Sequence, residues 1–251
     1  MKQIITRIHL WTGLLLGLQV IAWMASGVIM SWFDIDTVTG RDRASPEKTV
    51  SIEDIETDIS LDSVLADLPF TQSITFRKIA DEPILEVTDS FDDVTLINMI
   101  TGEPLIIGEA KALAIAKADY SGEWNGANIR LWDKPHYEIR SRDLPLWRVE
   151  VEDDRGTRLY VSSTEGKVVA RRNDIWRLYD FFWMLHIMDY GERHDFNNPL
   201  LKIASATGLL FALSGIGLVF LRLRSQRYQN DLERLRTVTL RYRGKAPKRR
   251  S

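Results

Sequence analysis

IHLWTGLLLGLQVIAWMASGVIMSWF at residues 8–33 decides the fold of this chain, together with IASATGLLFALSGIGLVFL at residues 203–221. Neither stretch contains Asp, Glu, Lys or Arg. At about 1.5 Å per helical residue, each is long enough to cross a hydrocarbon core of roughly 30 Å. The residues between them, 34–198, are polar enough to fold in water. The sequence therefore predicts two transmembrane helices that flank a water-soluble module.

The charges beside the two apolar segments predict their orientation. Lys2 and Arg7 precede the first segment, and no acidic residue occurs before position 34. The second segment is followed by 11 Lys/Arg and two acidic residues, whereas residues 34–198 hold 33 Asp/Glu and 19 Lys/Arg. Because basic flanks stay cytoplasmic, we expect both termini inside and the acidic module outside. The basic tail is then expected to contact anionic lipid and not nucleic acid.

A cleaved signal peptide is the alternative for the first segment. Its apolar run exceeds the roughly 7–15 residues of a signal-peptide core, and AWMASG shows no small-x-small cleavage pattern. A retained anchor is therefore predicted. The chain has no cysteine, which excludes disulfides and thiolate ligands.

Two stretches of the middle segment have the same pattern. PILEVTDSFDDVTLINMITGEPL begins at Pro83, and PLWRVEVEDDRGTRLYVSSTEGKVV begins at Pro145. Each predicts a strand, an acidic turn, a second strand, a glycine-containing turn and a short final strand, and each follows a helical stretch, 61–68 or 109–120. We therefore predict an α+β fold in which a helix plus an antiparallel sheet occurs twice, the first copy being the more divergent.

The strand that begins the second copy shows the alternation most clearly. Apolar and charged residues alternate along it, in the order Trp147, Arg148, Val149, Glu150, Val151 and Glu152. This period of two predicts a half-buried strand. The acidic pairs at 92–93 and 153–154 fall at the hairpin turns, so turn chemistry explains them without paired catalytic carboxylates.

The second copy and the ARRNDIWRLYDFFWMLHIMDYGERHDFNNPLL around its end (170–201), together with RIHLWTGLLLGLQVIAWMASGVIMSW (7–32), resemble the PepSY domain and PepSY-associated membrane-helix proteins of bacteria. The resemblance covers the first span, about residues 109–170, and the stretch through the second span. It implies a cytoplasmic-membrane protein with its PepSY module in the periplasm, and PepSY modules are associated with peptidase inhibition or regulation. Larger relatives with four or more spans resemble haem-carrying reductases that release iron from siderophores.

These observations divide the chain into six segments. The predicted boundaries are 1–33 for the first helix, 34–107 for a divergent PepSY-like copy, 108–171 for the PepSY-like domain, 172–198 for an interfacial aromatic helix and loop, 199–222 for the second helix, and 223–251 for the basic cytoplasmic tail.

His9 is the first candidate ligand. Gly13 and Gly17 follow it on the same helical face, and a histidine above two glycines leaves room for a flat porphyrin, to which neutral imidazole is a common ligand. The alternative is that Gly13-x-x-x-Gly17 is a helix-packing groove and His9 an interfacial polar residue.

Both apolar segments carry a seam of distinct residues. Thr12, Gln19 and Ser26 recur every seven residues in the first segment. Small residues line one face of the second: Ala204, Gly208 and Ala212. We expect these two seams to pack directly against each other instead of forming a transport path.

Residues 174–190 are predicted to form an amphipathic helix at the outer membrane interface. Spacings of three and four put five residues on one face: Trp176, Tyr179, Trp183, His186 and Tyr190. A separate charged stripe consists of Asp174, Arg177 and Asp180. For His186, three roles stay open: a haem ligand, a contact to a quinone or other ligand, and a structural hydrogen-bonding residue.

Histidines and carboxylates also gather after this helix. His186, Asp189, His194 and Asp195, with Glu192 between them, could hold a divalent ion. The alternative is an exposed loop in a module that is acidic throughout. His136 is expected at the surface or at a strand edge.

Geometry limits how haem could be held. His9 and His186 are predicted on opposite sides of the membrane, on the order of 30 Å apart by the helical rise, so they cannot share one haem within one chain. Ligation needs His186 with His194, a second copy in a homo-oligomer, or a partner protein.

The sequence contains no catalytic triad, HExxH, phosphate-binding glycine loop or dinucleotide fingerprint, and we predict no catalytic residue. We predict a two-pass protein whose PepSY-like module binds a protein or peptide, or assists a membrane complex, through its exposed sheet and edge. The alternative is a haem b component of an iron–siderophore reductase, with His9 and His186 as ligands.

Overall fold

The computed structural model describes residues 2–46, 60–66, 68, 70–140 and 142–223. The chain divides into two compact units. We call the first the helix unit, which consists of Met1–Gly27, Leu185–Tyr190 and His194–Ser251. The second is the sheet unit, which consists of Val28–Met184 and Gly191–Arg193.

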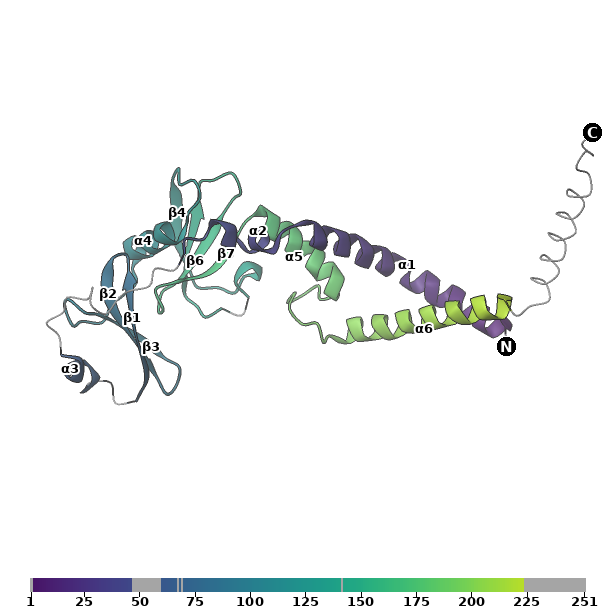
Figure 1. The fold of residues 1–251 in the computed structure, drawn as a ribbon, viewed down its shortest axis with the longest axis horizontal. Coiled ribbons are helices and arrows are strands. Elements are labelled where there is room, and N and C mark those ends of the chain that lie inside the picture. Colours follow the sequence, from purple (N-terminus) through teal and green to yellow (C-terminus); the bar gives the residue numbers. More distant parts are fainter. Residues whose placement is uncertain (1, 47–59, 67, 69, 141, 224–251) are drawn as a thin grey trace, which may run out of the picture. The chain divides into compact units, whose positions relative to one another are not determined.

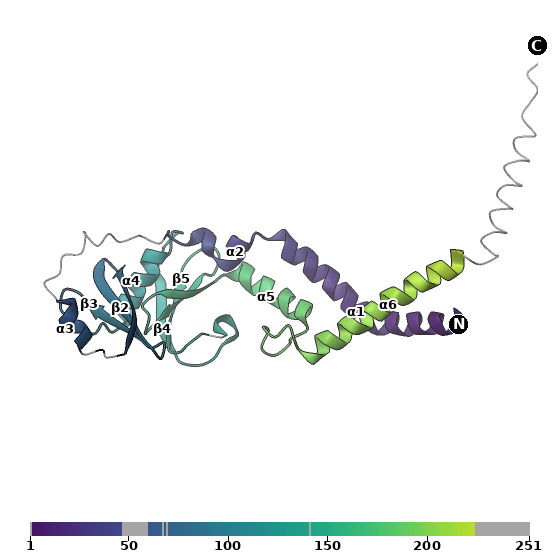
Figure 2. The same cartoon turned by 60° about the horizontal axis from the view of Figure 1, so that its bottom comes forward.

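Two long helices, α1 (Lys2–Trp32) and α6 (Pro199–Leu223), dominate the helix unit. Both are long and apolar enough to cross a membrane, as the sequence predicts. They run antiparallel, so the beginning of α1 lies beside the end of α6 (Figures 1 and 2). Helix α6 has a capped start: the Asn198 side chain accepts from the Leu201 amide at 2.8 Å, and Pro199 occupies the first turn.

The helix pair is held by a small apolar cluster. Leu16, Met188 and Ala204 are buried in it, and Phe211 packs against them. Most other apolar side chains of both helices are exposed. A helix that exposes apolar residues around most of its surface is suited to a lipid environment.

The sheet unit is built from two antiparallel sheets. The first has the order β1-β2-β3 and the second β4-β5-β6-β7. The strands are β1 (Thr71–Ile79), β2 (Glu82–Asp89), β3 (Val94–Asn98), β4 (Ala127–Trp132), β5 (Leu146–Val151), β6 (Arg158–Ser162) and β7 (Val168–Arg172). The helices are α2 (Ile35–Thr39), η1 (Arg41–Arg43), α3 (Leu61–Ala66), α4 (Glu109–Asp119), η3 (Tyr137–Ile139) and α5 (Asp174–Ile187), the last of which continues into the helix unit.

One apolar core joins the two sheets. Helix α4 supplies Ala112 and Ala116, β5 supplies Val149, β6 supplies Leu159, and β2 supplies Ile84. Each of these side chains is buried. Figure 1 shows α4 beside the four-stranded sheet, to which its small residues allow a close approach. The α+β class is confirmed, and each sheet is an antiparallel meander that follows a helix. That the two are copies of one unit remains a prediction.

The strand predicted over 147–152 is present as β5 (Leu146–Val151), but its second face is not solvated. Arg148 is only 5% exposed, because Leu146, Ile139 and Tyr160 form a second core cluster on that face. The Arg148 guanidinium lies 4.7 Å from the ring centroid of Trp132 and pairs with Glu150. The expectation of a half-buried strand is therefore wrong at Arg148. The sequence also did not predict β1 and β4.

Helix α5 ends earlier than the predicted helix over 174–190. Its last residue is Ile187, and Met188 has a φ of 54°, in the left-handed region. Tyr190 therefore lies outside the helix, and its assignment to the aromatic face of Trp176 and Trp183 is wrong.

Candidate functional site

His9 lies between the two long helices and contacts α6 directly. Its Nδ1 is 3.0 Å from the Ser214 hydroxyl, and its ring stacks on Phe211 with a centroid distance of 4.4 Å. A Cβ at Gly13 would lie 2.8 Å from the Phe211 ring, whereas one at Gly17 would meet nothing within 4 Å. Gly13 therefore lets α1 and α6 pack closely, as the packing hypothesis predicts, whereas Gly17 has no neighbour that a side chain would meet.

An apolar groove of about 520 Å³ opens beside His9 on α6. Its lining is His9, Phe211, Ala212, Gly215, Ile216, Val219, Phe220 and Leu223. Among the described residues, His9 is the one lining this groove whose side chain can form hydrogen bonds. The hydrogen bond with Ser214 fixes the orientation of its imidazole.

His186, at the end of α5, is bound to α1. The Ser26 hydroxyl is 2.9 Å from His186 Nδ1, and Ser26 is fully buried. Trp23 Nε1 donates to the His186 carbonyl at 2.8 Å, and Gln19 donates to the Leu185 carbonyl at 3.2 Å. The last carbonyls of a helix lack partners within the helix, so these side chains complete the end of α5.

The polar seam of α1 thus has a different partner from the predicted one. Gln19 and Ser26 bond to residues 185–186 and not to the small-residue seam of α6. Thr12 bonds to the Ile8 carbonyl of its own helix at 2.8 Å. The physical reason is that the end of α5 has unsatisfied carbonyls, while the backbone of α6 does not.

Of the predicted metal ligands, His186 lies in the last turn of α5, whereas Asp189, His194 and Asp195 lie in the loop between α5 and α6. The Asp189 carboxylate accepts from the backbone amides of His194 and Asp195, both at 3.0 Å, and the Asp195 carboxylate accepts from the Asn197 amide at 2.7 Å. Over the described ranges, no group of three or more His, Asp or Glu side chains is arranged to hold a metal ion. These carboxylates shape the turn, as aspartates commonly do.

Glu138 is the centre of the charged network in the sheet unit. Its side chain is fully buried. Its Oε1 accepts from Arg158 and Arg177, each at 2.8 Å, and its Oε2 accepts from the Tyr160 hydroxyl at 2.6 Å. Glu138 therefore joins η3, β6 and α5 through one carboxylate.

The charge on Glu138 is stabilised despite its burial. Desolvation alone would raise its pKa, but hydrogen bonds from Tyr160 and Arg177 and the charges of Arg177 and Arg158 hold the pKa below its ordinary value. Desolvation and the hydrogen bond to Glu138 raise the pKa of Tyr160 in turn. The sequence did not single out Glu138, which is one of 33 acidic residues between the two apolar segments.

The charged stripe predicted on α5 is mostly inside the sheet unit. Asp180 is 4% exposed and pairs with Arg140 and, at 2.9 Å, with Arg193. Arg177 reaches Glu138, and Asp174 alone is largely exposed. The stripe is therefore a packing surface for arginines and not a solvated face.

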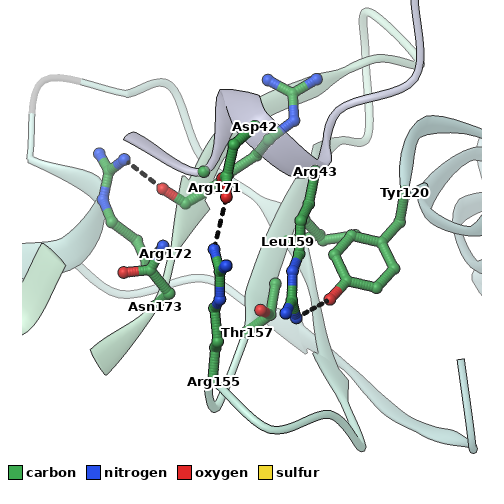
Figure 3. Close-up of a pocket in the computed structure, with 10 residues that line it drawn as sticks. Asp42, Arg43, Tyr120, Arg155, Thr157, Leu159, Arg171, Arg172 and Asn173 are labelled. Carbon is green, nitrogen blue, oxygen red and sulfur yellow. Dashed lines mark hydrogen bonds and ion pairs between the residues drawn. The ribbon is translucent and has the colours of Figure 1, made fainter. Parts of the chain in front are cut away.

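A second carboxylate, Asp153, holds the segment after α1 to the β5–β6 turn. Its Oδ1 accepts from the amides of Arg155 and Thr157 at 3.1 and 2.9 Å, and its Oδ2 accepts from Tyr120 and Arg43. The prediction that turn chemistry explains this acidic pair agrees with these bonds. Figure 3 shows Arg43 reaching the Tyr120 hydroxyl in the small pocket that these side chains line.

His136 is a half-buried residue at the start of η3. Its Nδ1 accepts from the Glu138 amide at 3.3 Å, and its ring lies 5.7 Å from that of Trp132. Burial lowers its pKa, although the charge of Glu138 opposes that shift. It thus lies beside the β4 edge and helps shape the loop that presents Glu138.

Strand β4 is an edge of the four-stranded sheet. Within the described ranges it pairs with β5 on one side and with no strand on the other. Leu131 is 51% exposed, and Asn128 and Arg130 are also exposed. An edge strand with an exposed apolar residue can accept an additional strand.

Comparison with known proteins gives one match. The family model described as the PepSY-associated TM region matches residues 6–251. No curated protein and no solved structure matches the chain. Since the match extends over both long helices and the module between them, this chain belongs to the PepSY-associated transmembrane family.

Proposed function

We propose that this protein is a two-pass protein of the bacterial cytoplasmic membrane, with both termini inside. Its periplasmic PepSY module binds a protein or peptide partner without catalysing a reaction. The proposal combines the charge asymmetry around the two helices with the family to which the chain belongs.

The observation that carries the proposal is the free edge of β4. Backbone amides and carbonyls on such an edge can pair with an extended segment of another chain, and side-chain contacts then supply specificity. Asn128 and Leu131 are exposed on this strand. The β5 strand beside it has buried residues on both faces, including Val149 and Arg148, and so anchors β4 to the core of the sheet unit.

The test is photo-crosslinking in cells from positions 128 and 131. We expect a protein adduct of the same mass from both positions. None is expected from position 91, because Phe91 is 73% exposed in the β2–β3 turn, away from strand β4. Leu131→Asp should abolish the adduct formed from position 128. If positions 128 and 131 form only lipid or self adducts, or if Leu131→Asp has no effect, the binding proposal is wrong.

The histidines support a second candidate, a haem b component of a reductase for iron–siderophore complexes. His9 and His186 each use Nδ1 for a serine hydroxyl, which is how a ligating histidine is often oriented. No described residue is bonded to the Nε2 of either one, and His9 adjoins an apolar groove. A second copy or a partner would complete each ligand pair.

A reduced-minus-oxidised spectrum of the purified protein tests the haem candidate. The candidate predicts a stoichiometric b-type α-band that is lost in His9→Ala or His186→Ala while circular dichroism is unchanged. A colourless preparation from haem-replete cells would rule it out.

A further inference from the structure

The sheet unit is acidic overall, yet it carries a local excess of positive charge beside α5. Four arginines are linked through their contacts and charges: Arg140, Arg142, Arg172 and Arg193. Arg140 and Arg172 both lie over the Trp176 ring, and the charge of Arg142 acts on Arg172. Arg140 and Arg193 both pair with Asp180. The charge of the nearby Glu138 partly offsets that of Arg172, but its carboxylate is already bound by Arg158 and Arg177.

Arg172 is a half-buried cation without a carboxylate partner among the described residues. Its Nε donates to the Glu138 carbonyl at 2.7 Å and its Nη1 to the Arg171 carbonyl at 2.8 Å. Figure 3 shows its side chain turned away from Arg43 and Tyr120. Burial and the charges of Arg142 and Arg140 lower the pKa of Arg172 to about 10, although the charge of Glu138 opposes that shift. A guanidinium in this position is stabilised by an added anion.

Aromatic rings are interleaved with these arginines. The Arg172 guanidinium lies 4.3 Å and that of Arg140 5.7 Å from the ring centroid of Trp176. The Arg193 guanidinium lies 5.1 Å from the ring centroid of Tyr137. Tryptophan and arginine together are typical of the headgroup region of a membrane.

Two further observations favour a lipid over a soluble anion. On the same helix as Trp176, Leu178 is 43% and Phe181 46% exposed, and their spacing of three residues makes them neighbours on the helix surface. Arg193 also precedes Pro199, the first residue of α6, by six positions. An extended chain of that length reaches about 20 Å, so connectivity alone keeps this cluster near the membrane that α6 is suited to cross.

We propose that Arg142, Arg172 and Arg193 bind the phosphate of an anionic phospholipid at the outer membrane surface. Planar guanidinium groups match phosphate oxygens in pairs, and Leu178 and Phe181 enter the acyl-chain region. The inference rests on the helix unit spanning a membrane, and it is independent of any protein partner at β4.

Native mass spectrometry of the full chain in mild detergent, with phosphatidylglycerol or phosphatidylcholine added, tests the proposal. Arg142→Gln should reduce the preference for phosphatidylglycerol about fivefold, and Arg142→Gln with Arg172→Gln by more, since each basic residue near a membrane contributes about 1 kcal/mol. Lys78→Gln, the same charge change at an exposed strand residue, should leave the preference unchanged. The sequence of the basic tail is the same in all variants.

Arg142 is exposed, so its single variant decides the matter if the double variant fails to fold. An unchanged lipid preference in folded Arg142→Gln would overturn the proposal. In a second arm, a phosphatidylglycerol with a photoreactive headgroup should label residues 174–181 of the wild type, and crosslinks confined to the tail would contradict it. If inorganic phosphate removes this labelling at equal concentration, the site binds free phosphate and the lipid assignment is wrong.

Discussion

The helix unit and the sheet unit join distant parts of the chain by different chemistry. In the helix unit the long-range contacts are hydrogen bonds between a histidine ring and a serine hydroxyl: His9 with Ser214 at 3.0 Å, and Ser26 with His186 at 2.9 Å. In the sheet unit the long-range contacts are ion pairs that centre on carboxylates, above all that of Glu138. Charged groups are costly in hydrocarbon, whereas a module in water can bury a carboxylate if arginines and hydroxyls surround it.

This difference implies that the two units fail in different ways. A single carboxylate holds together several elements of the sheet unit, so its removal should have a large effect there. The helix pair relies on shape, such as the fit of Phe211 over Gly13, and each of its hydrogen bonds contributes little. The following predictions test this contrast, starting with the largest effect.

Glu138→Ala should destabilise the sheet unit by about 3–5 kcal/mol, because it leaves the Arg158 and Arg177 guanidinium groups near a buried site without their shared acceptor. Chemical denaturation of the full chain, followed by tryptophan fluorescence, measures this. The matched control is Asp36→Ala, whose pair with Arg41 is exposed and should contribute about 1 kcal/mol or less. Equal effects of the two substitutions would contradict the central role of Glu138.

Acidification should produce a smaller loss at each carboxylate, since protonation removes the charge and keeps the side chain. Burial opposes the charged forms of Glu138 and Asp153, but their hydrogen bonds hold both pKa values below the ordinary ones. Their stabilising contribution is thus complete above the unfolded carboxyl pKa of about 4 and is lost as the pH falls through the lower folded values. Near-UV circular dichroism between neutral pH and pH 2 measures this, and Glu138→Gln should flatten the profile.

Gly13→Leu should separate α1 from α6 at a cost of about 1–3 kcal/mol, because its side chain would collide with Phe211. Gly17→Leu is the matched control, since a Cβ there meets nothing within 4 Å. The chain has no cysteine, so a pair introduced at Leu16 and Ala204 reports helix packing by disulfide formation. Unfolding of the sheet unit should be unchanged, and equal crosslinking in both variants would contradict the packing role of Gly13.

Ser26→Ala should have the smallest effect, about 0.6 kcal/mol, as is typical of a hydrogen bond between membrane helices. Hydrogen exchange should rise locally at residues 185–190, where His186 loses its hydroxyl partner. Ser31→Ala, whose hydroxyl bonds within its own helix at 2.9 Å, is the control. A global loss of stability in Ser26→Ala would contradict the expectation that each hydrogen bond of the helix unit contributes little to stability.

The helices and strands that could be predicted from the sequence are those with a clear pattern of apolar residues. The apolar spans leave a strong pattern because a helix suited to lipid is apolar around most of its surface. The strands at 146–151 and 158–162 leave one because most of their residues are buried. The strands that were missed, β1 and β4, have few buried residues and so show a weaker alternation: in β1 Ile79 alone is buried, and in β4 no residue is.

The charged network was beyond prediction for another reason. Glu138, Arg158 and Arg177 are brought together from three separate elements, and nothing in the local sequence distinguishes Glu138 from its many acidic neighbours. The same holds for Ser26 and His186, which lie 160 positions apart. Pairings of this kind depend on tertiary packing, whereas periodicity reports only one element at a time.

Labelling of single introduced cysteines in intact cells tests the central claim, the two-pass topology, most directly. With an impermeant maleimide, a cysteine in place of Ser73, which is exposed in the sheet unit, should react in intact cells. A cysteine in place of Gln3, exposed at the beginning of α1, should react only after the membrane is opened. The reverse pattern would contradict the topology on which the proposed function rests.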